Sequence, residues 1–175
     1  MLVRTGGPLA AVDPSEFTRT MARVPTPVTV VTTVDAAGRP WGFTASSFSS
    51  LSMDPPLVLV CPAKTASCHP AFVAADRFLV NVLSATQSDI AGRFARSGQD
   101  KFGDGDMVPS EEGLPGLAGA VARIACTLRE VLDGGDHSIL VGHVTSASVS
   151  GLDPLVYHDR RFTRPEPTPS LTTAG

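Results

Sequence analysis

The segment 42–52 combines hydroxyl side chains with small residues and carries no charge. Hydroxyls and backbone N–H groups donate hydrogen bonds to phosphate oxygens, and small side chains let a planar ring approach the backbone. This composition suits a nucleotide-like ligand. It equally suits a Ser- and Thr-rich edge strand that is solvated on its outer face. The six hydroxyl side chains are those of Thr44, Ser46, Ser47, Ser49, Ser50 and Ser52.

A second candidate is His137, which follows the glycine-rich sequence Gly134-Gly135-Asp136. A histidine just beyond such a turn can project into a cleft, where a ring nitrogen hydrogen-bonds a cofactor carboxamide or phosphate. Turns favour Gly and Asp on their own account, so an exposed imidazole at the end of a turn is the alternative. The other histidines are assigned to structure: His69, His143 and His158.

The metal-ligating residue types do not form a metal site in this sequence. The chain has three widely spaced cysteines, which are Cys61, Cys68 and Cys126. Because a disulfide framework needs an even, dense set, we expect free thiols. No CxxC or HxxxH spacing occurs. His137 and His143 would share one face of a strand, about 20 Å apart at ~3.3 Å per residue. We therefore expect no metal.

The elements that must position these residues are mostly strands. Turns at 35–38 and 133–136 separate apolar stretches, and the second is a strong hairpin signal because glycine accepts a positive φ. Most connections suit antiparallel pairing, so the sequence predicts a mainly β protein built on a closed or nearly closed barrel. Alternating patterns predict strands over 26–34, 41–52, 57–61, 77–84, 119–132, 137–148 and 155–157.

Three short helices are expected around this barrel. The sequence Asp13-Pro14-Ser15-Glu16 supplies an N-cap, a proline at the first helical position and a capping-box glutamate, for a helix that ends near Pro25. Ser67 caps a second helix that runs to about Ala75. Apolar residues at helical spacing predict a third over 86–97, followed by a Gly- and Asp-rich loop long enough to be functional.

Length and charge limit the classes of function. The chain has 175 residues, a net charge of -3 and only 14 Lys plus Arg. It suffices for one domain and offers no electrostatic basis for binding nucleic acid or an anionic membrane. No apolar run approaches the roughly 20 residues that cross a bilayer, and the first residues lack the apolar core of a signal peptide. We expect a cytoplasmic protein with a flexible N-terminus (1–12), one domain (13–164) and a disordered tail (165–175).

Several segments together point to a family. In chain order they are Thr26–Thr32, Gly42–Ser50, Pro55–Val58, Val80–Leu83, Lys101-Phe102, Gly135–His137 and Pro154–Tyr157. Over roughly residues 13–164 the chain closely resembles the short-chain flavin reductases that serve two-component monooxygenases. The hydroxyl-rich strand and the Gly-Asp-His turn are the most specific pair of features.

The resemblance implies an FMN-binding split β-barrel, which is an antiparallel Greek-key fold with a few short peripheral helices. It implies a homodimer with flavin near the subunit interface. It also implies an NAD(P)H:flavin oxidoreductase, which reduces FMN or FAD with NADH or NADPH as hydride donor. The reduced flavin is then released or passed to a flavin-dependent oxygenase component. No nucleic acid or membrane partner is expected.

The resemblance also implies the site residues. His137 would face the nicotinamide as the catalytic residue. Lys101 and Phe102 would lie near the flavin phosphate, and Cys61 and Ser67 near the ring or ribityl chain. The full set implied for flavin binding is Thr44, Ala45, Ser46, Ser47, Ser50, Ser52, Cys61, Ser67, Asn81, Leu83, Lys101 and Phe102.

One residue departs from the family pattern. Many relatives have glycine where this chain has Pro27, and proline removes an N–H that could bond the flavin ring. This bears on flavin preference more than on flavin binding. Two rival functions fit the same barrel: a flavin-binding electron carrier or storage protein without nicotinamide turnover, and an oxidase of a pyridoxine phosphate. The second would need a dense basic pocket, which the sequence does not show.

Overall fold

The structure, a computed structural model, describes residues 11–98, 100–110 and 112–166. The flexible N-terminus and the disordered tail expected from the sequence lie outside these residues, apart from 11–12 and 165–166. Along the described residues, the elements in chain order are α1 (Pro14–Ala22), β1 (Thr26–Pro27), β2 (Thr29–Val34), β3 (Pro40–Ala45), β4 (Ser49–Met53), β5 (Pro56–Val60), α2 (His69–Ala74), β6 (Arg77–Val82), α3 (Ser88–Ala95), β7 (Met107–Pro109), β8 (Pro115–Leu117), β9 (Ala122–Gly134), β10 (His137–Val149), β11 (Val156–His158) and β12 (Arg161–Thr163).

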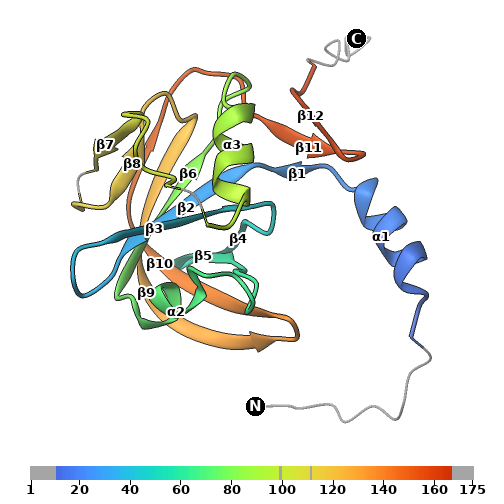
Figure 1. Ribbon diagram of the computed structural model, residues 1–175, viewed down its shortest axis with the longest axis horizontal. Helices are drawn as coiled ribbons and strands as arrows, with labels where there is room; N and C mark the ends of the chain where they lie inside the picture. Colours follow the sequence, from blue (N-terminus) through green and yellow to red (C-terminus); the bar gives the residue numbers. More distant parts are fainter. Residues whose placement is uncertain (1–10, 99, 111, 167–175) are drawn as a thin grey trace, which may run out of the picture.

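Seven strands form one antiparallel sheet in the order β3-β2-β6-β9-β10-β5-β4 (Figure 1). β3 and β4 are consecutive in the chain, with only residues 46–48 between them, yet they occupy opposite edges of the sheet. The sheet must therefore curl until its edges approach each other at this short connection. The result is a barrel that is split between β3 and β4, which confirms the mainly β, antiparallel barrel predicted from the sequence.

The second strand of the sheet is β2, which lies between β3 and β6. Its valines and threonines are buried on both faces. Val30 and Val31 have no exposed surface and pack into different cores. A buried hydroxyl requires a hydrogen-bond partner, and each threonine of β2 donates to a backbone carbonyl. These bonds join Thr29 to Ala45, Thr32 to Pro115 and Thr33 to Arg77, at 2.9, 2.6 and 2.7 Å.

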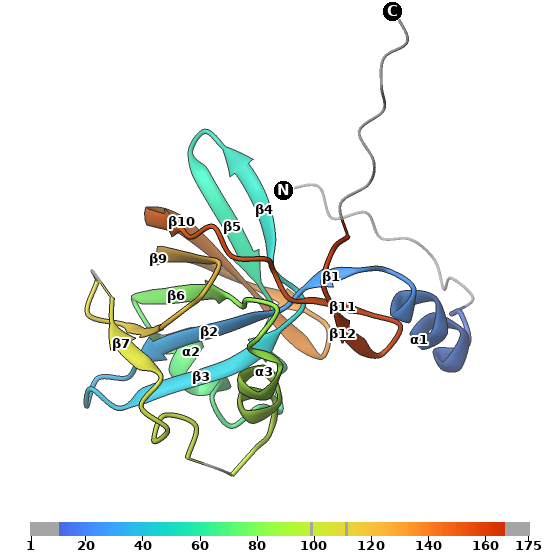
Figure 2. The same cartoon turned by 90° about the horizontal axis from the view of Figure 1, so that it is seen from above.

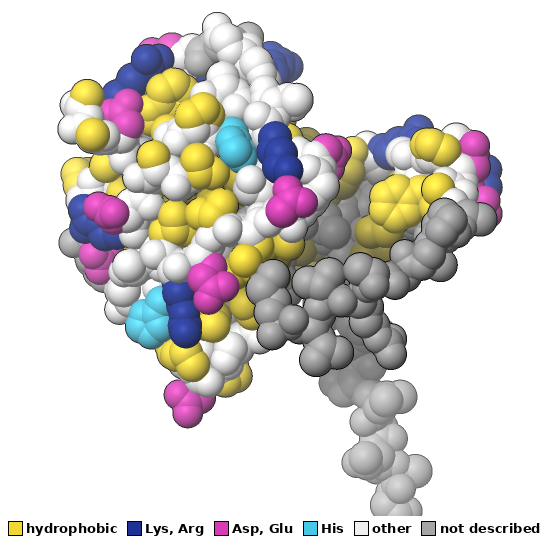
Figure 3. Space-filling model, turned by 90° about the horizontal axis from the view of Figure 1, so that it is seen from below, with side chains coloured by type: hydrophobic (Ala, Val, Ile, Leu, Met, Phe, Trp, Pro, Cys, Tyr) yellow, Lys and Arg dark blue, Asp and Glu magenta, His cyan; other side chains and the backbone are white. Residues whose placement is uncertain are grey.

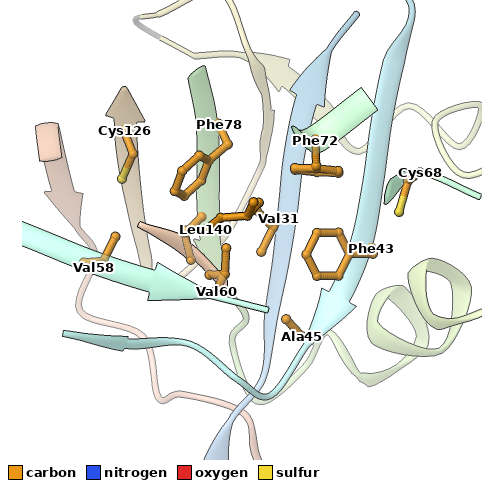
Figure 4. Packing of buried hydrophobic residues seen from close by; sticks show 11 residues of the cluster. Val31, Phe43, Ala45, Val58, Val60, Cys68, Phe72, Phe78, Cys126 and Leu140 are labelled. Carbon is orange, nitrogen blue, oxygen red and sulfur yellow. The ribbon is translucent and has the colours of Figure 1, made fainter. Parts of the chain in front are cut away.

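The two larger hydrophobic cores lie on the two faces of the sheet, and a third, smaller cluster contains Leu79, Leu114 and Ala125. The inner core fills the barrel, and α2 contributes Phe72 to it (Figure 4). The rings of Phe43 and Phe72 pack edge to face, with their centroids 4.8 Å apart. The outer core lies beneath α3, which buries Ile90 and Phe94 against the sheet. The barrel wall next to α3 is thereby packed on both sides, which gives β3 a fixed position.

The structure corrects two boundaries. The segment 41–52, predicted as one strand, is divided into β3 and β4, because the chain must cross from one edge of the sheet to the other at 46–48. Ser67 does not cap α2: the helix begins at His69, and Cys68 occupies the cap position without a side-chain hydrogen bond. The N-cap of α1 is as predicted, since Asp13 accepts hydrogen bonds from the backbone N–H groups of Ser15 and Glu16.

Two features project from the barrel. β4 and β5 extend as a hairpin, and α1 lies to one side with a small sheet of β1, β11 and β12 (Figure 2). No residue of α1 is buried. No helix in the described part of the chain has the length and apolar character needed to cross a membrane.

Candidate functional site

Two adjoining hollows form a cleft along the β3 edge of the barrel. The larger has a volume of about 650 Å³ and the smaller about 190 Å³. Both are lined by Ser67, Cys68 and Lys101, so they meet at these residues. The larger hollow extends to Arg39 and Phe102, whereas the smaller is lined by residues that include Thr44, Cys61 and His137. Cavities of this total size are typical of sites for nucleotide-sized ligands.

Lys101 lies where the two hollows meet, and its position is fixed by the backbone. Its ammonium group donates to the carbonyl of Gly42 in β3 at 3.2 Å and to that of Phe94 in α3 at 2.9 Å. An ammonium group has three donors, so one remains for a ligand in the cleft. Burial lowers the pKa of Lys101 below its ordinary value of 10.5.

The loop that carries Lys101 is tied to α3 at several points. Arg93 in α3 forms ion pairs with Asp104 and Asp106. The rings of Phe94 and Phe102 pack edge to face, with their centroids 5.3 Å apart. A loop held by both charge and ring packing presents its lysine at a defined position, which favours binding of a phosphate over general attraction of anions.

Two hydroxyls of the predicted phosphate-binding segment are already bonded to the protein. Thr44 donates to the carbonyl of Ala91 at 2.7 Å and thereby joins β3 to α3. Ser47 accepts from the N–H of Cys61 at 3.0 Å and donates to the carbonyl of Cys61 at 3.3 Å. Thr44 lines the smaller hollow, whereas Ser47 lines neither hollow. Ser46, the neighbour of Ser47, is exposed in the connection between β3 and β4.

His137 begins β10 and lines the smaller hollow. Its Nδ1 lies 2.8 Å from Oδ1 of Asp136, and this hydrogen bond lowers the pKa of Asp136. The turn is anchored by Lys64, whose backbone N–H donates to the carbonyl of Asp136 at 2.9 Å. When Nδ1 of a neutral imidazole donates to the carboxylate, Nε2 is left as an acceptor. His137 thus lines the cleft, and its role beside the nicotinamide stays a prediction.

Two residues predicted to contact flavin lie away from both hollows. Asn81 and Leu83 have no exposed surface. Asn81 donates to the carbonyl of Val30 at 3.1 Å and accepts from the N–H of Leu117 at 2.9 Å, so its amide joins backbone segments inside the protein. Leu83 packs in the outer core. Neither side chain reaches the cleft, because this face of β6 is covered.

The other predicted residues are divided between the cleft and its surroundings. Ala45 is buried at the end of β3. Ser50 and Ser52 lie on β4 opposite Val58 and Leu57, and of the described residues that line the two hollows none comes from β4. Pro27, the departure from the family pattern, lies in β1 opposite Val156, away from both hollows.

Several residues that line the cleft were not recognised in the sequence. Arg39, Trp41 and Asp100 line the larger hollow, and Arg96 lines the smaller. Trp41 is the one tryptophan of the chain, and it lies two residues from an arginine at the end of a hairpin. That combination was a usable signal, although only the fold shows that it faces the same cleft as Lys101.

Comparison with protein families agrees with this geometry. The model of the flavin reductase like domain matches residues 21–166. The chain belongs to the flavin reductase family. This match confirms the family resemblance inferred from the sequence, and it covers β1 to β12, including every residue of the cleft.

Individual flavin reductase relatives are similar over most of the chain. The actinorhodin polyketide dimerase of Streptomyces coelicolor is 48% identical over 153 residues, which are 87% of this chain and 86% of that protein. The NADH:riboflavin 5'-phosphate oxidoreductase of Streptomyces pristinaespiralis is 42% identical, with coverage of 90% and 92%. Two relatives from Rhizobium meliloti are longer, and the chain spans 63% and 47% of their lengths.

A solved structure shows the same fold. The NADH:FAD oxidoreductase SgcE6 of Streptomyces globisporus, in complex with NAD and FAD fragments, superposes with a TM-score of 0.83 at 39% identity. The match covers 91% of this chain and 98% of that protein. The split barrel described above is thus the fold of a flavin reductase.

Proposed function

We propose that this chain reduces FMN or FAD with NADH or NADPH and supplies the reduced flavin to a separate flavin-dependent oxygenase. The observation that carries the proposal is the meeting of two hollows at Lys101, in a chain that belongs to the flavin reductase family. The names of its relatives support the same activity, since one is an NADH:riboflavin 5'-phosphate oxidoreductase. Because the activity draws on reduced nicotinamide, we assign it to the cytoplasm.

The cleft fits a flavin nucleotide. Lys101 offers one N–H to a phosphate, and the exposed Ser67 lines both hollows beside it. The wall formed by Phe43, Thr44 and Cys61 is uncharged and suits a planar ring. Phe102 closes the larger hollow beside Lys101. Flavin, when bound, accepts hydride from the nicotinamide, so the reaction requires no protein nucleophile.

The contribution of the protein is to place the two ligands. His137 holds its Nδ1 toward Asp136, so its Nε2 is available to accept a hydrogen bond from the nicotinamide carboxamide. The smaller hollow brings His137, Thr44 and Cys61 together and limits the space around the reacting rings. Such positioning is worth several kcal/mol of activation free energy, up to about 7–11 kcal/mol in well-oriented intramolecular reactions.

The decisive experiment measures oxidation of NADH and of NADPH by the purified protein, with FMN and FAD added in turn. A reductase oxidises the nicotinamide catalytically in the presence of at least one flavin. A carrier or storage protein would bind flavin tightly and oxidise no more than one equivalent of nicotinamide. The absence of turnover with all four pairs would overturn the proposal. Coupling to a purified oxygenase then tests the supply of reduced flavin.

The assembly proposed for this enzyme is a homodimer. α1 projects from the barrel with no buried residue, and hydrophobic side chains gather on the lobe that it forms (Figure 3). Phe17 and Met21, one turn apart, are 55% and 46% exposed. A hydrophobic stripe that the chain does not cover favours a second copy as its partner. Light scattering on the native protein should give the mass of two chains.

Paired substitutions test this assembly. Replacing Phe17 and Met21 together with Asp should yield monomers, because a charge at the centre of a hydrophobic interface is not compensated. Arg19→Ala, on the same helix, should remain dimeric. A native protein that has the mass of one chain at every concentration tested would contradict the dimer.

A further inference from the structure

Arg39 and Trp41 form a stacked pair in the wall of the larger hollow. The guanidinium carbon of Arg39 lies 4.5 Å from the centre of the indole ring. Both residues line the hollow, as does Lys101. Arginine favours such an arrangement because its planar guanidinium group stacks on aromatic rings while its N–H groups remain available as donors.

The pair is held in place by the hairpin turn between β2 and β3. The indole N–H of Trp41 donates to Oδ2 of Asp35 at 2.9 Å. The other carboxylate oxygen of Asp35 accepts from the backbone N–H groups of Ala37 and Arg39, at 3.0 and 2.9 Å. One carboxylate thus fixes both the turn and the indole. Asp35 is in this sense a positioning residue.

Of the stacked Arg39 and Trp41 side chains, the arginine is the more exposed to solvent. Trp41 is half-buried and packs against the inner core, and the guanidinium group of Arg39 covers it from outside. Arg39 is exposed, and among the described carboxylates none forms an ion pair with it. A planar cation is therefore presented to the hollow on a rigid support.

The charge of the hollow differs from that of the whole protein. The chain has a net charge of -3, yet the described charged residues that line the larger hollow are Arg39, Lys101 and the one carboxylate Asp100, with Asp35 interacting with Arg39 from outside the lining. Asp100 accepts a hydrogen bond from the N–H of Phe102 and so stabilises the loop. Two cations separated along one cleft match two linked phosphates better than one.

We infer that the Arg39–Trp41 pair binds the adenine nucleotide half of a dinucleotide, with the adenine stacked on the guanidinium group and a phosphate within reach of its N–H donors. The dinucleotide is FAD or the nicotinamide coenzyme, which share this half. The inference rests on the proposed function, because it assigns the flavin and nicotinamide rings to the smaller hollow. The larger hollow, at about 650 Å³, has room for the remainder of either ligand.

The single tryptophan makes this binding directly measurable. Because Trp41 is the one tryptophan in the chain, its fluorescence reports on this pair alone. Titration with AMP, which is the shared half of both dinucleotides, should change the emission of Trp41. Arg39→Ala should weaken AMP binding about tenfold, the effect of losing one charge-assisted hydrogen bond. Calorimetric titration with AMP measures the dissociation constant independently of Trp41 fluorescence.

Kinetic measurements identify which dinucleotide is bound. If the dinucleotide bound by the Arg39–Trp41 pair is FAD, Arg39→Ala raises KM for FAD about tenfold more than KM for FMN. If it is the nicotinamide coenzyme, the substitution raises KM for NADH to a similar extent whichever flavin is present. Arg129→Ala, which removes an exposed arginine of β9 outside both hollows, is the matched control and should change none of these values.

The outcomes of these experiments distinguish a failure of the Arg39–Trp41 inference from a failure of the proposed flavin reductase activity. Loss of AMP binding in Arg39→Ala supports the inference. An enzyme that reduces FMN but shows no response of Trp41 emission and no heat with AMP overturns the inference and leaves the proposed function standing. An enzyme that reduces neither flavin overturns both.

Discussion

The hydroxyl of Ser47 bonds both the N–H and the carbonyl of Cys61, at 3.0 and 3.3 Å. Ser47 lies in the connection between the two edge strands of the barrel, and Cys61 follows β5. The Ser47 side chain thus ties this connection to the residue that follows β5, next to the pairing of β4 with β5. The same connection forms part of the proposed flavin site, so its stability and its function are linked.

Ser47→Ala should destabilise the protein. The substitution leaves the N–H and the carbonyl of Cys61 without this partner in a half-buried position, which costs about 1–3 kcal/mol for an unsatisfied buried group. Urea denaturation measures the change in the free energy of unfolding. Ser49→Ala is the control, because the Ser49 hydroxyl bonds only the adjacent carbonyl of Ser50 at an exposed site. Equal stability of the two variants would show that water replaces the Ser47 hydroxyl.

The sequence predicted the barrel because its strands carry strong local signals. The valine and threonine alternation of β2 and the glycine turn before His137 are local patterns, and both correspond to the structure. The break in the segment 41–52 could not be predicted in this way. Its residues favour an extended chain throughout, and only the closing of the sheet requires β3 and β4 to lie on opposite edges.

In the candidate site, His137 was expected from the glycine-rich turn before it and Lys101 from the family resemblance, whereas contacts that depend on packing could not be predicted. Lys101 and His137 were expected in the site, and the structure brings both to one cleft. Asn81 was assigned to the flavin because the family resemblance places it beside the ring. Its amide instead bonds the backbone of β2 and β8, which come together only after the strands are ordered in space. Arg39 was overlooked for the same reason.

Gly42→Ala should disturb the packing between β3 and α3. A Cβ atom at this position would lie 2.7 Å from the Phe94 ring and 3.2 Å from the carbonyl of Val31. Since Phe94 packs against Phe102, relief of the clash displaces the loop that carries Lys101. We expect a loss of about 1–3 kcal/mol in stability, typical of overpacking. Thermal unfolding provides the measurement.

Gly92→Ala is the matched control for this prediction. Gly92 lies in α3, and a Cβ atom there meets nothing within 4 Å. Replacing a helical glycine with alanine should stabilise the protein by about 0.5–1 kcal/mol. Opposite signs for the two glycine substitutions are therefore expected. A stable Gly42→Ala variant would indicate that the Phe94 ring moves without cost.

Flavin affinity should decrease in alkaline solution at a pH below the ordinary pKa of lysine. Burial lowers the pKa of Lys101 from 10.5, so the ammonium group loses its proton earlier than an exposed lysine as the pH rises. The neutral amine no longer attracts the flavin phosphate. Dissociation constants for FMN, measured by fluorescence quenching across the alkaline range, check this expectation.

Two substitutions of Lys101 isolate its charge. Lys101→Met should bind FMN weakly at every pH and lose the alkaline transition. Lys101→Arg keeps a charge that does not titrate in this range, so it should retain affinity where the native protein loses it. The same alkaline transition in the native protein and in Lys101→Met would assign it to another group.

His137→Ala should impair the use of nicotinamide more than the binding of flavin. Loss of a hydrogen bond that orients the nicotinamide predicts a decrease of about tenfold in kcat/KM for NADH. The dissociation constant of FMN, which is held mainly by Lys101, should change less. Asp136→Asn retains the imidazole but replaces the carboxylate that holds Nδ1, so its effect should be smaller and in the same direction. His143→Ala, a histidine of β10 outside the cleft, should behave as the native protein. Native values of KM and kcat in His137→Ala would exclude the imidazole from the reaction.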